Sequence, residues 1–274
     1  MKPENLKGIV KEKYGAIARQ SSLPEKLRGC CGPSKCCNEL DFCMIGDEYN
    51  GVAGYNQDAD LGLGCGLPTK FVEIKPGNSV LDLGSGAGND CFVARTLIGE
   101  TGLVTGLDFS KEMLEKANAN LKESGFRNMR FVHGDIDKMP FDNNLFDIVI
   151  SNSVLNLVPE KEKAFAEIFR VLKPAGHFCI SDIVVSDKLP PKLLKAAEMY
   201  AGCVAGALQK EDYLALIEQQ GFSEIKVETE KPITLPDDIL TQYLSENEKM
   251  DFKNSGTGIF SITVTAKKLI QDGI

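Results

Sequence analysis

Tryptophan is absent from this sequence of 274 residues, and histidine occurs at only two positions. With so few histidines, a metal site built from several of them is excluded. Positive charge is also in deficit, because 31 lysines and arginines stand against 39 aspartates and glutamates, for a net charge of -8. Phosphate binding needs a concentrated positive surface, so this balance argues against a nucleic-acid partner and favours small-molecule chemistry.

Long apolar runs are missing too. No stretch approaches the roughly 20 apolar residues that cross a bilayer, and Met1 to Asn5 lack the apolar core of a signal peptide. We therefore expect a cytoplasmic protein with no membrane partner. Because a reducing compartment keeps thiols free, the nine cysteines are expected to serve metals, catalysis or redox cycling instead of a disulfide framework.

Short apolar strands alternate with amphipathic helices from about residue 71 onward, a pattern typical of βαβ units and a parallel sheet. The predicted strands are Ser79–Leu83, Leu103–Leu107, Arg130–Val132, Phe146–Ser151, His177–Val185, Ile225–Glu230 and Ile259–Ala266. The predicted helices are Asp90–Ile98, one capped by Ser110, Glu160–Leu172, Pro191–Tyr200 and Lys210–Gln220. Together they predict an α/β fold with a Rossmann-like, seven-stranded sheet and helices on both faces.

The pattern divides the chain into three regions. Residues 1–70 are predicted to be a loop-rich segment that carries a cysteine cluster and then a glycine-rich loop. Residues 71–188 are predicted to form the core that binds a cofactor. Residues 189–274 are predicted to be a C-terminal part that completes the sheet and covers the substrate site, with a helix starting near Pro236.

A glycine-rich turn, Gly84 to Gly88, directly follows the first strand and precedes a helix, a context in which such a turn can cradle a ligand. A dinucleotide fingerprint would need glycine at position 89, where this chain has asparagine. With Asp82 ahead of the first glycine, the turn resembles the D-x-G-x-G-x-G pattern of methyltransferases. That resemblance implies a turn facing the amino-acid end of S-adenosylmethionine (SAM).

Carboxylates that follow the next two strands agree with SAM as the cofactor. Asp108 ends the second strand, where it can accept both ribose hydroxyls. Asp135 follows the third strand, where it can accept from the adenine amino group while Ile136 packs on the ring. The expected cofactor-binding residues are Asp82, Gly84, Ser85, Gly86, Gly88, Asp90, Asp108, Phe109, Met113, Gly134, Asp135, Ile136 and Asn152.

Several segments resemble arsenite methyltransferases, from about Val10 to Phe222. They are Tyr14-Gly15 followed by the cysteine-rich patch, Leu61 to Gly66, Asp82 to Phe92, Ile150 to Asn152 with Asn156-Leu157, and Tyr200 to Leu208. The resemblance implies methyl transfer to trivalent arsenic, inorganic or monomethylated, in arsenic detoxification. Arsenic(III) is soft, so thiolates are its natural ligands, and its lone pair can attack a methyl group without a general base.

The resemblance also assigns roles to thiols. It implies that Cys65 and Cys203 bind arsenic, and that Tyr55 lies near the transferred methyl group. One or more of the N-terminal thiols would receive the metalloid or form a disulfide with Cys65 during turnover, and a thiol reductant such as glutathione or a thioredoxin-type protein would be a partner. The N-terminal candidates are Cys30, Cys31, Cys36 and Cys37, of which we favour Cys36 and Cys37.

One position departs from the family pattern, because Ser153 stands where the family usually carries a third cysteine. Two core thiols suit monomethylated arsenic, which has two exchangeable positions, whereas arsenite needs a third. Cys91 and Cys179 lie in apolar runs and are expected to be small buried hydrophobes.

Three alternatives remain open at this point. The N-terminal cysteine cluster could hold zinc, although its spacing is not that of standard zinc sites. The enzyme could methylate a small organic acceptor, as the quinone C-methyltransferases do, which would need an apolar slot and no thiols at Cys65 or Cys203. The chain could also be a thiol-based metalloid-binding protein, and SAM binding would count against that.

Overall fold

The computed structural model describes residues 3–21, 49–187, 206–233, 240–241, 243–254 and 258–269, together with Leu189 and Lys192. Several predictions fall outside these residues. They concern the N-terminal cysteines at positions 30, 31, 36, 37 and 43, Cys203, the predicted helix Pro191–Tyr200 and the start of the helix near Pro236.

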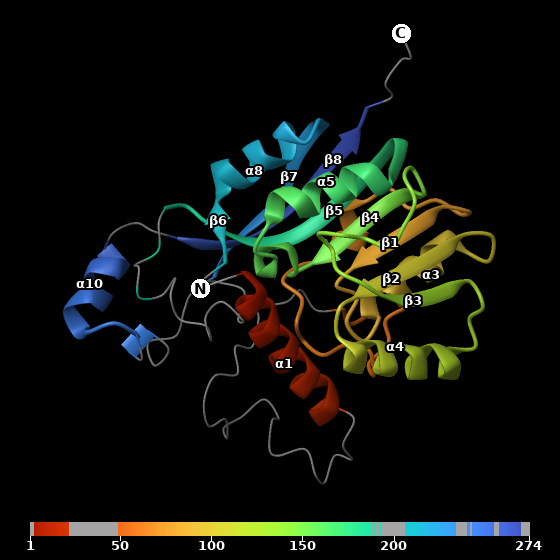
Figure 1. The fold of residues 1–274 in the computed structure, drawn as a ribbon, viewed down its shortest axis with the longest axis horizontal. Coiled ribbons are helices and arrows are strands. Elements are labelled where there is room, and N and C mark those ends of the chain that lie inside the picture. Colours follow the sequence, from red (N-terminus) through yellow and green to blue (C-terminus); the bar gives the residue numbers. More distant parts are fainter. Residues whose placement is uncertain are drawn as a thin grey trace.

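The described residues form one central sheet with helices around it (Figure 1). The strands are β1 Ser79–Leu83, β2 Leu103–Asp108, β3 Met129–His133, β4 Phe146–Asn152, β5 Leu172–Val185, β6 Leu208–Gln209, β7 Phe222–Ile233 and β8 Ile259–Lys268. The helices are α1 Pro3–Ser21, α2 Pro68–Phe71, α3 Asn89–Ile98, α4 Lys111–Ser124, α5 Lys161–Val171, α8 Lys210–Gln219, α10 Glu246–Asn254 and the short 3-10 helix Leu155–Leu157.

The strand order is β3-β2-β1-β4-β5-β8-β7, and the two-residue β6 pairs with β5 off this path. Strands β1 to β5 run parallel, whereas β8 pairs antiparallel with both β5 and β7. All seven predicted strands are therefore confirmed, and β6 is an addition. The carboxyl ends of β1, β2 and β4 lie side by side, because Leu83 pairs with both Leu107 and Ser151.

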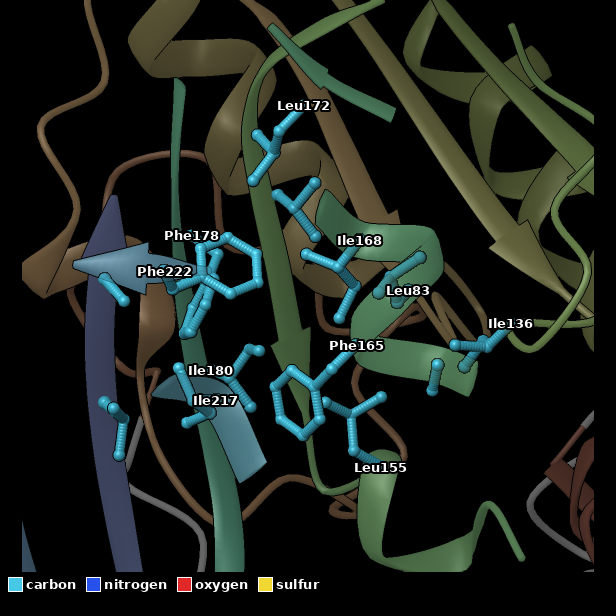
Figure 2. Packing of buried hydrophobic residues seen from close by; sticks show 14 of the residues in the cluster. Leu83, Ile136, Leu155, Phe165, Ile168, Leu172, Phe178, Ile180, Ile217 and Phe222 are labelled. Carbon is cyan, nitrogen blue, oxygen red and sulfur yellow. The ribbon is translucent and has the colours of Figure 1, made fainter. Parts of the chain in front are cut away.

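Alternate residues of each strand pack on opposite faces of the sheet, as the pleat requires. Leu81, Val149 and Phe178 belong to a core that includes α5 and α8, and Figure 2 shows its aromatic centre around Phe165, Phe178 and Phe222. The neighbouring Val80, Ile148, Ile150 and Cys179 belong to a second core with the side chains of α3. The prediction of helices on both faces is confirmed.

Helix α1 is a regular element within residues 1–70, the region that the sequence predicts to be loop-rich. It packs beside α4, where Arg19 pairs with Glu112 at 2.8 Å (Figure 1). One of its faces carries an apolar or aromatic side chain every fourth residue, a spacing that brings side chains together on a helix. These residues are Leu6, Val10, Tyr14 and Ala18. The spacing was present in the sequence and was overlooked.

Candidate active site

A cavity opens where β1, β2 and β4 end, the edge at which open α/β sheets bind their ligands. Its walls come from the strand ends, the glycine turn, α1, α3, α4 and the loop before α2. The lining residues are Tyr14, Tyr49, Ala59, Asp60, Leu61, Leu63, Gly64, Asp82, Gly84, Gly86, Ala87, Asn89, Asp90, Asp108, Phe109, Met113, Asn152, Ser153, Val154 and Leu157. The cavity therefore brings together residues that lie as far apart in the sequence as Tyr14 and Leu157.

The turn between β1 and α3 needs its glycines. Gly84, Gly86 and Gly88 have φ values of 63°, 51° and 99°, in the left-handed region that side chains disfavour. A Cβ on Gly84 would lie 2.5 Å from Val154, and one on Gly88 would lie 2.7 Å from Phe131. The turn can thus pass close to a ligand only with glycine at these positions.

Three buried carboxylates face this turn. Asp108 accepts hydrogen bonds from the backbone N–H groups of Gly86 at 2.9 Å and Ser110 at 2.8 Å. Burial raises the pKa of Asp108, and these backbone bonds act in the opposite direction. Burial also raises the pKa of Asp82, helped by the nearby charge of Asp90. Such a cluster is stabilised by a cationic ligand, and a sulfonium with an ammonium group supplies two positive charges.

Asp90 sits in the first turn of α3 and is held by two neutral donors. The Tyr49 hydroxyl donates to Oδ1 at 2.8 Å and the Asn152 amide donates to Oδ2 at 3.2 Å. Burial raises the pKa of Asp90 to about 6, although these hydrogen bonds lower it. Asp90 is therefore mostly ionised at neutral pH and ready to face a cation.

A second cavity adjoins the first and shares Gly84, Asp108, Phe109, Val154 and Leu157 with it. Its other lining residues are Lys7, Val10, Gly134, Asp135, Ile136, Val158 and Pro159. The structure thus brings Gly134, Asp135 and Ile136 together with Asp108 in the lining of this second cavity. Lys7 of α1 closes this end, with Nζ 3.1 Å from Asp135 and 2.7 Å from Asp137.

The cavity fits the SAM expected from the sequence. Ser85 Oγ and Asn89 Oδ1 are buried polar atoms with no hydrogen-bond partner among the described residues, and Asn89 lines the cavity. No side chain in the described part of the chain caps the N-terminus of α3, where the first N–H groups of a helix can bind a carboxylate. Ser85 and Gly88 shape the turn and are not lining residues, whereas the remaining predicted cofactor residues line one cavity or the other.

The thiol positions divide into those that the structure describes and those that it does not. Cys65 is buried, next to the lining residue Gly64, and packs with Val10, Leu157 and Ile183. Cys36, Cys37 and Cys203 lie outside the described residues. Among the described residues, no group of three or more histidine, cysteine or acidic side chains could hold a metal ion.

Four further predicted positions are described. Tyr55 does not line the cavity but stacks on Tyr49, with ring centroids 6.2 Å apart. Ser153 does line the cavity, with a φ of 60°. Cys91 and Cys179 are fully buried as predicted, but Cys91 is more than a hydrophobe, because its thiol donates to Asp82 at 3.2 Å.

Sequence reasoning missed Tyr14, Tyr49, Asp60 and Lys7 as cavity residues. Tyr14 and Lys7 belong to the overlooked α1, and the four-residue spacing of that helix was the available signal. Tyr49 and Asp60 lie outside helices and strands. In such segments no periodic pattern of apolar residues indicates which side chains point into the cavity.

The parallel sheet with its antiparallel β8, the glycine turn and the acidic cavity define a class I SAM-dependent methyltransferase. A profile described as a methyltransferase domain matches residues 74–221. Arsenite methyltransferase of Halobacterium salinarum is 34% identical, over 98% of this chain and 68% of that protein. The human arsenite methyltransferase is 35% identical, over 71% of this chain and 55% of that protein.

Solved structures agree with the sequence comparisons. An arsenic(III) S-adenosylmethionine methyltransferase from Chlamydomonas reinhardtii is 30% identical, with a TM-score of 0.64, over 77% of this chain and 69% of that one. The chain belongs to the arsenite methyltransferase family. No helix among the described residues has the length and apolar character to cross a membrane.

Proposed function

We propose that this enzyme transfers the methyl group of SAM to thiol-bound trivalent arsenic, arsenite or its monomethylated form, in arsenic detoxification. The observation that carries the proposal is the Cys65 loop beside the acidic cavity. Its backbone N–H donates to Asn152 at 2.9 Å, and its carbonyl accepts from Ser261 at 2.6 Å. A soft thiol fixed beside a site for a methyl donor is what arsenic(III) methylation needs.

In this proposal, different cavity residues bind different parts of the cofactor. Asp108 accepts the ribose hydroxyls, and Asp135 and Ile136 bind adenine in the second cavity. The glycine turn, with Asp82 and Asp90 at its two ends, holds the amino-acid portion. SAM supplies an electrophilic methyl group on a sulfonium, so the protein itself has to align the acceptor and exclude water.

The thiols have separate tasks. Cys65 and Cys203 bind arsenic with the lone pair directed at the methyl group, and Tyr55 lies nearby. Transfer uses that lone pair and leaves arsenic formally pentavalent, so two electrons must return it to the trivalent state. Cys65 supplies them together with Cys36 or Cys37, because oxidation of two thiols to a disulfide releases two electrons and two protons, and glutathione or a thioredoxin-type protein reduces that disulfide again. Residues 1–70 thus serve thiol delivery and also supply part of the cavity wall, residues 71–188 bind SAM, and residues 189–274 cover the acceptor.

Replacement of Cys65 by alanine tests the proposal, with Cys179→Ala as the matched control. Both cysteines are buried and neither lines the cavity, but Cys65 directly follows the lining residue Gly64. We expect Cys65→Ala to lose arsenic methylation while calorimetry finds its SAM affinity within about threefold of wild type, a change below 1 kcal/mol. Cys179→Ala should keep both. Full arsenic methylation by Cys65→Ala would remove the thiol from the mechanism.

A further inference from the structure

Asn152, the last residue of β4, is bonded to the loop that carries Cys65. Its Oδ1 accepts from the backbone N–H groups of Cys65 at 2.9 Å and Gly66 at 3.2 Å. Its Nδ2 donates to the carbonyl oxygen of Gly66 at 2.8 Å. The oxygen and the nitrogen of this one side-chain amide therefore both form hydrogen bonds, and together they satisfy three backbone groups of the loop.

The loop lies so close to the strand ends that glycine is required on both sides of the cysteine. A Cβ on Gly64 would lie 2.7 Å from Asn152 Nδ2, and a Cβ on Gly66 would collide with Ser181 Oγ. From β8, Ser261 holds the Cys65 carbonyl at 2.6 Å. The Cys65 peptide is thus fastened by β4 through its N–H and by β8 through its C=O.

The same amide reaches the other side of the cavity through Tyr49. Asn152 Nδ2 donates to the Tyr49 hydroxyl at 2.9 Å, and that hydroxyl donates to Asp90 Oδ1 at 2.8 Å. Nδ2 also points at Asp90 Oδ2, at 3.2 Å. Burial keeps the pKa of Tyr49 far above neutrality, so its hydroxyl remains a donor. A continuous chain of hydrogen bonds links the first turn of α3 to the Cys65 backbone.

We infer that Asn152 is a positioning residue for the Cys65 thiol, and that Tyr49 couples occupancy of the cofactor site at Asp90 to binding of arsenic at Cys65. The inference rests on the proposed function of Cys65. It also changes the role predicted for Asn152, from a cofactor contact to the link between cofactor and acceptor. A ligand that contacts the Asp90 carboxylate fixes the position of that group, which accepts from both Tyr49 and Asn152, and so orders the loop that Asn152 holds.

Thermodynamic coupling is reciprocal, so the effect can be measured from the cofactor side. The probe is S-adenosylhomocysteine, which shares the amino-acid end of SAM and has no methyl group to transfer. Its Kd is measured by calorimetry with and without saturating arsenite, on the full chain in a non-thiol reductant. We expect arsenite to lower this Kd at least fivefold in the wild type.

Two variants interrupt the chain of hydrogen bonds at different points. Tyr49→Phe removes one hydroxyl, and Asn152→Asp keeps the acceptor for the Cys65 N–H but loses the donor to Tyr49 and Gly66. Both should reduce the effect of arsenite to less than twofold, and Tyr49→Phe should keep the Kd without arsenite within threefold of wild type. Tyr213→Phe is the matched control, because it removes a buried tyrosine bond to Asp182 instead. It should keep the full coupling.

The outcomes separate this inference from the proposed function. Coupling that persists in both Tyr49→Phe and Asn152→Asp, or that is absent from the wild type, overturns the inference. Coupling that persists in Cys65→Ala shows that arsenic acts elsewhere, and then the proposed role of Cys65 fails. Ser261→Ala adds a second readout: it should raise the KM for arsenite at least threefold and leave the Kd of S-adenosylhomocysteine unchanged.

Discussion

Asp108 offers the sharpest test of the cofactor site, because its carboxylate both holds the backbone of the glycine turn and is proposed to bind the ribose of SAM. Both of its oxygens already accept backbone N–H groups, from Gly86 and Ser110. From the sequence alone, Asp108→Ala is expected to weaken SAM binding with the fold intact. The structure changes that expectation, since alanine would leave two buried donors unsatisfied, at about 1 to 3 kcal/mol each. Asp108→Asn keeps one acceptor and is the better probe.

The magnitude follows from the bonds that ribose would lose. Charge-assisted hydrogen bonds contribute about 1.5 to 3 kcal/mol each. Asp108→Asn loses one of them and turns the other into a neutral bond, so we predict a loss of about 2 to 3 kcal/mol, roughly 30- to 150-fold in Kd. The assay is calorimetry with SAM, together with urea unfolding to confirm that Asp108→Asn is folded. A folded Asp108→Asn that binds SAM as tightly as the wild type would refute the assignment of Asp108 to ribose.

Further predictions concern pH and cysteine chemistry. Burial raises the pKa of Asp182 to about 7, so the native state holds its proton longer than the unfolded chain does. The free energy of unfolding should therefore fall by about 3 kcal/mol between pH 4 and pH 7 through this group, and Asp182→Asn should remove that part in urea titrations. Cys91→Ala should cost about 1 kcal/mol of stability and also weaken SAM binding, because Asp82 loses a donor; unchanged SAM affinity would speak against that link. Ser153→Cys should raise the rate of arsenite methylation more than that of the monomethyl substrate, and equal gains would mean that position 153 does not face arsenic.

The sheet could be predicted from the sequence because its strands are short apolar runs with clear stops. Ser110 is an example of a local signal that the structure confirms, since its hydroxyl accepts from Met113 N at 3.3 Å and caps α4. Helix α1 was missed because a run of glycines and cysteines later in the same region outweighed its four-residue spacing. Its helical state depends on contacts with α4 and with the loop after β3, which lie more than 90 positions away in the sequence.

The site residues also divide into those that the sequence predicts and those that only the folded structure reveals. The positions of Asp82, Asp108 and Asp135 at the carboxyl ends of three successive strands could be predicted from the sequence, because these strands are neighbours in the sheet. The role of Asn152 could not, because its partners are backbone groups of a loop 86 positions earlier in the chain. The role of Tyr49 could not be predicted from the sequence either, because only the fold places its hydroxyl between Asp90 and Asn152.

The most direct test of the central claim follows the methyl group itself. The protein is incubated with SAM labelled in the methyl carbon, arsenite and glutathione, and the arsenic species are separated and their label measured. The account predicts labelled methylarsenic species that form with the wild type and with Cys179→Ala, and that are missing with Cys65→Ala. Consumption of SAM without label on arsenic, or equal labelling by Cys65→Ala, would contradict it.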